Sequence, residues 1–268
     1  MQMRGPGMRY DAATRQLRPV MSVSLARAGL LVLALAAWQL ASLGGLPSYM
    51  LGPVEILKDF WAALGTSELY GHVGASLTRS LPGFALGTAA GAALGLAAGA
   101  VRWVDRMLSP AVFLSYPVPK IVMLPIFMLW FGIGDLSKIL IIALACFYPV
   151  FINAYYGARQ TRTILVWSAL NMGAGRARIF RSVVLPSAAP MIFAGMRVSL
   201  ALSFVVMFAA EMINARSGLG HLIRVAEYSL RFDLMWVSLI SIAILGYAGD
   251  RLMRLARGRL LAWQGEPR

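Results

Sequence analysis

The sequence predicts an all-α membrane protein with six transmembrane helices, and three observations support this fold class. First, 59% of the 268 residues are hydrophobic and 13% are charged, about half the charged fraction of an average soluble domain. Second, several apolar runs approach or reach the roughly 20 residues that a helix needs to cross a bilayer. Third, the basic residues behind the net charge of +14 lie between these runs. A nucleic-acid-binding protein would instead gather them on one soluble face, so that class is excluded.

The N-terminal segment, residues 1–24, is expected to be a flexible cytoplasmic tail. Its arginines precede an apolar run at 25–43 and so resemble the basic region of a signal peptide. The run lacks a small-residue cleavage site and is too long for that role, so we predict a retained first span. The sequence leaves open whether translation starts at Met1 or at a later methionine such as Met21.

The other five spans follow from apolar runs of similar length. They are predicted at residues 80–101, 108–131, 139–158, 186–210 and 234–250. Two of them contain a basic residue, Lys120 in the third span and Arg197 in the fifth. Prolines on both sides of Lys120 are expected to break or kink the third span, because proline removes a backbone donor and clashes with the preceding turn. The transmembrane domain as a whole thus covers residues 25–268.

The distribution of basic residues predicts the orientation in the membrane. Cytoplasmic loops are enriched in Lys and Arg, and six spans place both termini on one side. With the termini inside, the inner segments carry seventeen basic and four acidic residues, whereas the outer segments carry six of each. The net charges of +13 and 0 therefore place both termini in the cytoplasm.

Two outer segments have the spacing of amphipathic helices. After Pro53, the apolar residues Val54, Leu57 and Trp61 recur at helical spacing opposite charged ones. The pattern predicts a short helix along the outer surface. Residues 219–230 repeat the pattern, and the two helices could cover the outer mouth of the bundle.

Five glycines of the second span form a ridge at every fourth position. They are Gly83, Gly87, Gly91, Gly95 and Gly99. This spacing aligns them on one helix face, where the missing side chains let another backbone approach closely. The ridge predicts packing either within the bundle or, alternatively, against a second copy of the chain.

The residue types needed for catalysis or metal binding are not grouped. His72 and His221 are the two histidines of the chain, and neither has a second ligand type at metal-binding spacing. Cys146 stands alone in an apolar run, which is typical of a buried thiol. No glycine-rich loop is followed by Lys and Ser or Thr, the pattern that holds nucleotide phosphates. We therefore expect no bound metal or cofactor and no ATP hydrolysis by this chain.

The most informative stretch is the inner loop at residues 159–185. It carries five arginines and no acidic residue, but it also contains Trp167 and several aliphatic residues. Such a mixture is too apolar for a solvated connection. We expect a short helix from Ser168, ending near Gly173 or Gly175, that projects from the membrane as a docking element.

This loop resembles the characteristic cytoplasmic loop of ABC importer permeases. That family's pattern is Glu-Ala-Ala, three residues, Gly, nine residues, Ile, one residue, Leu-Pro. Here Trp167 stands at the Glu position, and Ser168 stands at the first Ala position. The resemblance implies a coupling helix that sits in a cleft of an ATPase subunit. The residues expected to form this docking segment are Trp167, Ser168, Ala169, Gly173, Arg176, Leu185 and Pro186.

Motifs along the rest of the chain, outside the predicted tail, resemble the nitrate, sulfonate and taurine type of these permeases. They include Leu51-Gly52-Pro53, Gly83-Phe84, Pro117 to Lys120, Leu129 to Gly134, Ala210-Glu211-Met212 and Ser217 to Gly220. The resemblance implies the type I ABC importer permease fold and a bacterial inner membrane location. It also implies a homodimer that works with two ATP-binding subunits, which hold ATP and Mg, and with an outer substrate-binding protein. The implied solute is a small anion such as a sulfonate, nitrate or taurine, with a vitamin precursor such as a pyrimidine as the alternative.

Three charged residues are expected within the spans or, for Glu211, directly at the end of one. A charge at mid-span costs about 2.5–3.5 kcal/mol, so such residues usually face a bundle interior or a wet cavity. Lys120 and Arg197 are either a positive lining for an anionic solute or structural charges satisfied by carbonyls or by a carboxylate of a neighbouring span. Glu211 lies about 21 Å from Arg197 along one helix, so these two cannot pair. With the following residues 217–220, Glu211 is either an outer gate or docking rim, or a helix end before a glycine turn.

Two other classes fit the sequence less well. An ion-gradient-driven secondary transporter would be expected to show paired repeats and midplane carboxylates, and no predicted span has a central Asp or Glu. A membrane enzyme would need His, Asp or Ser side chains clustered near one interface. The secondary transporter is kept as the alternative function.

Overall fold

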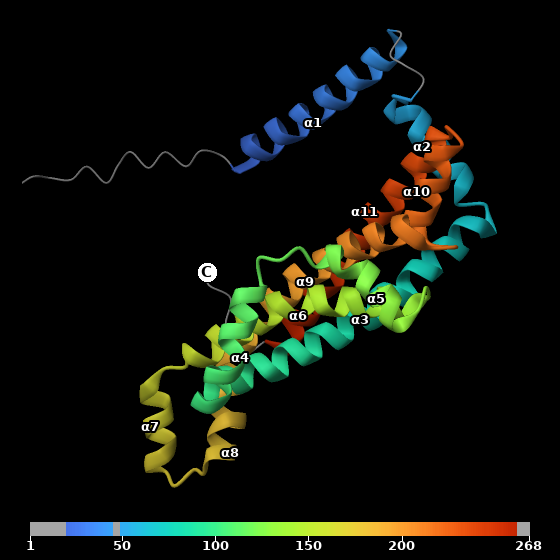
Figure 1. Ribbon diagram of the computed structural model, residues 1–268. Helices are drawn as coiled ribbons and strands as arrows, with labels where there is room; N and C mark the ends of the chain where they lie inside the picture. The colour runs from blue at the N-terminus through green and yellow to red at the C-terminus, as the bar shows by residue number, and fades with distance from the viewer. Residues whose placement is uncertain (1–19, 45–48, 262–268) are drawn as a thin grey trace, which may run out of the picture. The chain divides into compact units, whose positions relative to one another are not determined.

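The computed structural model describes residues 20–44 and 49–261, and all regular secondary structure within these ranges is helical. Of the predicted tail, residues 1–19 lie outside the described ranges. The chain separates into two units, Met1–Leu57 and Lys58–Arg268. Figure 1 traces both units in chain order.

The first unit contains α1 and the start of α2. Helix α1 (Val20–Leu43) includes an apolar stretch, Ala26–Leu43, that is long enough to cross a membrane. Helix α2 (Pro53–Ala63) starts at Pro53 as predicted. The Gln39 side chain of α1 accepts a hydrogen bond from the Val54 amide at 3.0 Å, which ties the end of α1 to the first turn of α2.

The second unit is a helical bundle centred on one helix. In chain order its helices are α3 (Ser67–Ala100), α4 (Arg102–Ser115), η2 (Lys120–Met123), α5 (Leu124–Phe131), α6 (Asp135–Arg159), α7 (Thr163–Asn171), α8 (Arg176–Ile179), η3 (Phe180–Val184), α9 (Leu185–Asn214), α10 (Leu219–Tyr228) and α11 (Phe232–Leu260). Helix α6 packs against both α3 and α9, and α10 packs against α9 and α11 (Figure 1). The side chains of Phe151, Ile141 and Val150 on α6 are fully buried, so α6 forms the core.

The number of membrane-crossing helices agrees with the predicted six if one bent pair counts as a single span. Within the described residues, five helices are long and apolar enough to cross a membrane. Helix α4 and the η2–α5 segment pass the same test together but are bent by 94°. The bend contains Pro117 and Pro119, as the sequence predicted. The third span is therefore broken.

Several helices extend beyond the spans predicted from the sequence. Helix α3 begins at Ser67 and not near residue 80, and its 34 residues reach about 51 Å, well beyond a hydrocarbon core of about 30 Å. The fifth span is one continuous helical stretch, Arg176–Asn214, and α11 continues to Leu260. Hydropathy identifies only the apolar part of a helix that can lie in the hydrocarbon core. The helix itself can continue through polar residues beyond that part. As a result Arg79 and Lys138, counted above in outer segments, lie within α3 and α6.

The glycine ridge of α3 packs against α6 of the same chain. A Cβ added at Gly91 would lie 2.6 Å from the Phe147 carbonyl oxygen and 3.0 Å from the Val150 Cβ. A Cβ at Gly99 would lie 2.6 Å from the Tyr155 carbonyl oxygen. Because α6 occupies this face, the ridge contributes to packing within the bundle and is not a surface for a second copy.

The two short helices of the predicted outer segments differ in how they are buried. Helix α10 buries Leu222, Ile223 and Ala226, the residues that its spacing placed on one face. On α2, by contrast, the expected apolar face is exposed, and Trp61 is 76% exposed. The stripe that packs into the bundle includes Phe60 and Ala63. Apolar residues lie on most sides of α2, so their spacing alone did not single out the packed face.

Candidate functional site

The candidate docking segment, residues 159–185, contains α7, α8 and the single π-helical turn η3. Helix α7 begins at Thr163 and not at Ser168 as predicted. Its first residues are β-branched or follow a polar turn. Their helix propensity is low, so the sequence gives only a weak signal for the start of this helix. Ser168 instead lies inside the helix, where its hydroxyl donates to the Ile164 carbonyl at 2.8 Å.

Helix α7 ends at Asn171, two residues before Gly173, which is one of the two glycines near which the sequence placed its end. The Ala174 amide donates to the Ala169 carbonyl at 3.0 Å, and the Gly173 amide donates to the Leu170 carbonyl at 2.9 Å. These two bonds form a Schellman motif, which needs a left-handed residue. Gly173 supplies it with a φ of 76°. The direction in which the chain leaves α7 therefore depends on a glycine.

The docking segment exposes large apolar side chains outside the membrane-spanning part of the chain. Ile164, Trp167 and Met172 are 62%, 64% and 83% exposed. Exposed apolar groups of this size on one short segment mark a surface for another protein or for the membrane. Leu185 and Pro186 lie in the first turn of α9, directly after the π-helical turn η3.

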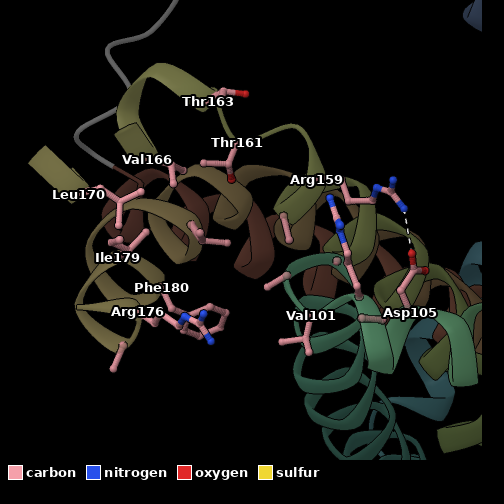
Figure 2. Close-up of a pocket in the computed structure, with 17 residues that line it drawn as sticks. Val101, Asp105, Arg159, Thr161, Thr163, Val166, Leu170, Arg176, Ile179 and Phe180 are labelled. Carbon is pink, nitrogen blue, oxygen red and sulfur yellow. Dashed lines mark hydrogen bonds and ion pairs between the residues drawn. The ribbon is translucent and has the colours of Figure 1, made fainter. Parts of the chain in front are cut away.

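A cavity of about 1140 Å³ lies between the docking segment and the inner ends of α3, α4 and α6 (Figure 2). Arg176 lines it from α8, and Arg159 lines it from the end of α6. Arg159 forms an ion pair with Asp105 at 3.0 Å on one side of the cavity (Figure 2).

Lys120 lies at the break of the third span, and its ammonium group is fully engaged. Nζ donates to the carbonyls of Ser115 at 2.6 Å, Tyr116 at 3.2 Å and Val118 at 2.7 Å. It also lies 4.0 Å from the centre of the Tyr148 ring. An ammonium has three donors, so none is left for a solute. The broken helix supplies the carbonyls, which is the structural alternative proposed from the sequence.

Arg197 contacts a carboxylate of a neighbouring span. Its Nε donates to Asp250 Oδ1 at 2.6 Å, and its Nη2 donates to Asp250 Oδ2 at 3.3 Å. Asp250 belongs to α11 and also pairs with Arg254 at 3.0 Å. Arg197 is therefore paired with a carboxylate that it shares with Arg254.

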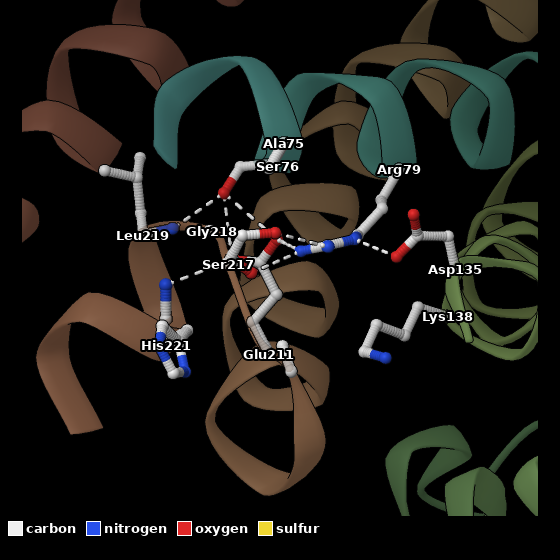
Figure 3. A network of polar contacts seen from close by, with 12 residues as sticks. Ala75, Ser76, Arg79, Asp135, Lys138, Glu211, Ser217, Gly218, Leu219 and His221 are labelled. Carbon is white, nitrogen blue, oxygen red and sulfur yellow. Dashed lines mark hydrogen bonds and ion pairs between the residues drawn. The ribbon is translucent and has the colours of Figure 1, made fainter. Parts of the chain in front are cut away.

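Glu211 is fully buried near the C-terminal end of α9 and pairs with Arg79 of α3 at 2.7 Å (Figure 3). Arg79 is 4% exposed and makes further contacts with its other nitrogens. Its Nε donates to Asp135 at the start of α6 at 2.7 Å, and its Nη2 donates to the Ser217 hydroxyl at 3.0 Å. One guanidinium thus joins α3, α6, α9 and the loop before α10.

The same network satisfies the backbone amides at the start of α10 (Figure 3). The Gly218 amide donates to His72 Nδ1 at 3.0 Å, and the Leu219 amide donates to the Ser76 hydroxyl at 2.9 Å. The Gly220 amide donates to the Glu211 carboxylate at 3.0 Å. These amides have no partner within α10, and a carboxylate there is also favoured by the helix dipole.

Two further titratable groups, His221 and Lys138, border this network. Burial, helped by Arg224 and His72, lowers the pKa of the His221 imidazole below its usual value, so this ring is neutral at pH 7. Lys138 is 3% exposed and donates to the Gly134 carbonyl at 2.9 Å. Among the residues that the structure describes, no group of three His, Cys, Asp or Glu could hold a metal.

The sequence interpretation missed Arg79 as the partner of Glu211. It excluded only Arg197 as a partner of Glu211, and this exclusion was correct because Arg197 and Glu211 lie far apart on one helix. A usable signal was present, since His72, Ser76 and Arg79 recur at helical spacing. Polar side chains aligned in this way on a membrane helix face the bundle interior.

The fold and these buried charges define a multi-pass helical membrane protein. The chain belongs to the family of binding-protein-dependent transport system inner membrane components, whose model matches residues 87–261. It is therefore a multi-pass inner membrane protein of ABC import systems and not an enzyme of the membrane. The resemblance stated from the sequence and its fold class are confirmed.

Relatives with assigned names cover most of the chain. The aliphatic sulfonates transport permease protein of Escherichia coli is 36% identical over 85% of this chain and 88% of its own length. The taurine transport system permease protein of the same organism is 33% identical over 91% of each. The riboflavin transport system permease protein of Chloroflexus aurantiacus is 33% identical over 98% of this chain and 99% of its own. None of these relatives supports the ion-gradient-driven alternative.

A solved structure shows the same fold. A chain of the MetNI methionine ABC transporter, solved in inward-facing conformations, superimposes with a TM-score of 0.59 at 22% identity. The match covers 70% of this chain and 95% of the other. The type I importer permease fold predicted from the sequence is thereby confirmed.

Proposed function

We propose that two copies of this chain form the translocation path of an ABC importer. Two cytoplasmic ATP-binding subunits bind ATP and Mg and hydrolyse the nucleotide, while this chain binds neither. A substrate-binding protein delivers the solute on the outer side. Both termini and the docking segment face the cytoplasm, as the excess of basic residues in the inner segments predicts.

The observation that carries this proposal is the exposed apolar surface of α7. An exposed segment with Ile164, Trp167 and Met172 needs a protein partner, and the family's transport systems contain an ATPase. Trp167 replaces the family's Glu, so the contact is mainly apolar where a carboxylate would make an ionic one. We therefore expect the ATPase to offer an apolar cleft to α7.

The helical path from the docking segment to the outer end supports a mechanical role. Arg176–Asn214 is a continuous helical stretch of 39 residues, about 58 Å long. It connects the docking segment directly to Glu211. When ATP binding draws the ATPase subunits together, movement of α7 would be carried along α9 to the Arg79–Glu211 network, which we propose to be part of the outer gate.

The solute is proposed to be a small sulfonate-like anion, because the sulfonate and taurine permeases are close in sequence over nearly the whole chain. The riboflavin permease relative keeps a vitamin-type solute as the alternative. Lys120 and Arg197 have their charges satisfied within the chain, so we assign them structural roles. Selection of the solute then rests mainly with the binding protein.

Co-purification tests the proposal. Affinity-tagged permease, expressed with the neighbouring ATPase gene, should retain the ATPase in stoichiometric amount. Trp167→Ala should weaken this retention, whereas Trp130→Ala, which removes an equally exposed tryptophan from α5, should not. Failure of the wild-type chain to retain an ATPase would contradict the proposal. Uptake of labelled taurine, an alkanesulfonate and riboflavin into vesicles containing the full system would then decide the solute class.

A further inference from the structure

The cavity at the inner end of the bundle carries positive charge that the described residues do not balance. Arg102, Arg159 and Arg176 line it, together with the single acid Asp105. The Arg159–Asp105 pair is neutral as a unit. In the described part of the chain, neither Arg102 nor Arg176 forms an ion pair with a carboxylate. The cavity therefore presents two guanidinium groups that pair with no carboxylate of the described residues.

The rest of the cavity wall is largely apolar. Val166 and Leu170 line it from α7, and Ile179 and Phe180 line it from α8 and η3 (Figure 2). Val101 contributes from the turn between α3 and α4 (Figure 2). A ligand that fits both parts of the wall needs an anionic group and an apolar portion.

The position of the cavity along the helices points to the membrane boundary. The spanning helices α3 and α6 end at Ala100 and Arg159, and both residues line the cavity. This is the level at which the apolar spans meet the basic inner segments. Under the orientation proposed above, it faces the cytoplasmic leaflet, where anionic lipids are found.

We propose that this cavity binds the phosphate of an anionic phospholipid, with Arg102 and Arg176 as its ligands. Arginine offers two parallel donors to a phosphate, and basic pockets at the inner ends of membrane helices are suited to such headgroups. A volume of about 1140 Å³ exceeds that of ordinary small-molecule sites and admits a headgroup with its glycerol.

A bound headgroup would brace the docking segment. It would join α8 to the start of α4 behind α7, and so restrict the angle at which α7 meets its partner. This part of the inference rests on the proposed function, whereas lipid binding itself requires the membrane location that the family establishes and the proposed orientation.

Lipid titration of the purified complex tests the site. The full-length chain, delipidated and held in detergent with its ATPase subunits, is titrated with dioleoylphosphatidylglycerol, dioleoylphosphatidylcholine or glycerol phosphate, and bound lipid is counted by native mass spectrometry. We expect the phosphatidylglycerol to bind and the other two to bind far more weakly. Arg102→Gln with Arg176→Gln should weaken binding about 30-fold, the usual effect of two basic side chains near an anionic surface.

Two further variants keep the test decisive. Arg251→Gln with Arg257→Gln removes two exposed arginines of α11 outside the cavity and should leave binding unchanged. Arg102→Lys with Arg176→Lys should keep most of the binding and shows that the positions tolerate substitution. Equal lipid binding by the wild type and the Gln variant would overturn the proposal. Binding of glycerol phosphate as tight as that of dioleoylphosphatidylglycerol would also overturn it. Loss of the ATPase from the wild-type complex would instead contradict the proposed function, and lipid counting on the permease alone would still test the site.

Discussion

Replacement of Gly91 by alanine tests the close packing of α3 against α6. The new Cβ would lie 2.6 Å from the Phe147 carbonyl oxygen and 3.1 Å from the Phe151 amide nitrogen, and backbone atoms of a core helix cannot move aside cheaply. Overpacking of this kind costs up to about 3 kcal/mol. Alanine also favours the helix over glycine by about 1 kcal/mol, so the net destabilisation is about 2 kcal/mol.

The matched control is Gly74→Ala in the same helix. Gly74 has no atom within 4 Å of an added Cβ, so only the gain in helix propensity of about 1 kcal/mol remains. In detergent, thermal unfolding followed by circular dichroism should show a midpoint lower by about 4–8 °C for Gly91→Ala and higher by about 2–4 °C for Gly74→Ala. A shift of the same sign in both variants would refute the packing argument.

Three other changes test the charged and docking residues. Arg79→Met should destabilise the fold by about 3–5 kcal/mol, because the fully buried Glu211 loses its ionic partner. Adding Glu211→Leu to this variant should restore part of the thermal midpoint. If the midpoint does not recover, the result argues against the ion pair. Gly173→Leu puts a residue with a side chain into the left-handed backbone conformation that follows α7. Co-purification of the ATPase should therefore fall, while the thermal midpoint changes little. Unchanged assembly and uptake would count against the docking segment. Lys120→Met and Arg197→Met should lower the yield of folded protein. In the protein that inserts into the membrane, the KM for an anionic solute should be unchanged. A higher KM measured in uptake assays would show that Lys120 and Arg197 line the translocation path.

The spans could be predicted from the sequence because lipid selects for apolar residues over a fixed length. Their ends could not, since α3 continues for thirteen residues before residue 80 with a sequence too polar to register as a span. The break at Lys120 was predictable because proline acts locally, through its own ring and its missing amide hydrogen.

The buried network was harder to predict because it depends on contacts between helices. Arg79 and Glu211 are 132 residues apart in the chain, and no local rule relates them. The short predicted second span also placed Arg79 in an outer loop, where a charge needs no partner. Correct helix bounds would have put Arg79 inside the membrane bundle and made a buried carboxylate the expected partner.

The π-helical turn η3 has a consequence for how docking segments can be exchanged between related permeases. A π turn holds one residue more than an α turn, so it rotates everything before it by about 100° around the axis of α9. A chimera that takes α7 and α8 from a relative without such a turn would present these helices to the ATPase rotated about the axis of α9. The unit to transplant is therefore residues 159–185 together, and deletion of a single residue from 180–184 should act as a rotation of the docking surface with its amino acids unchanged.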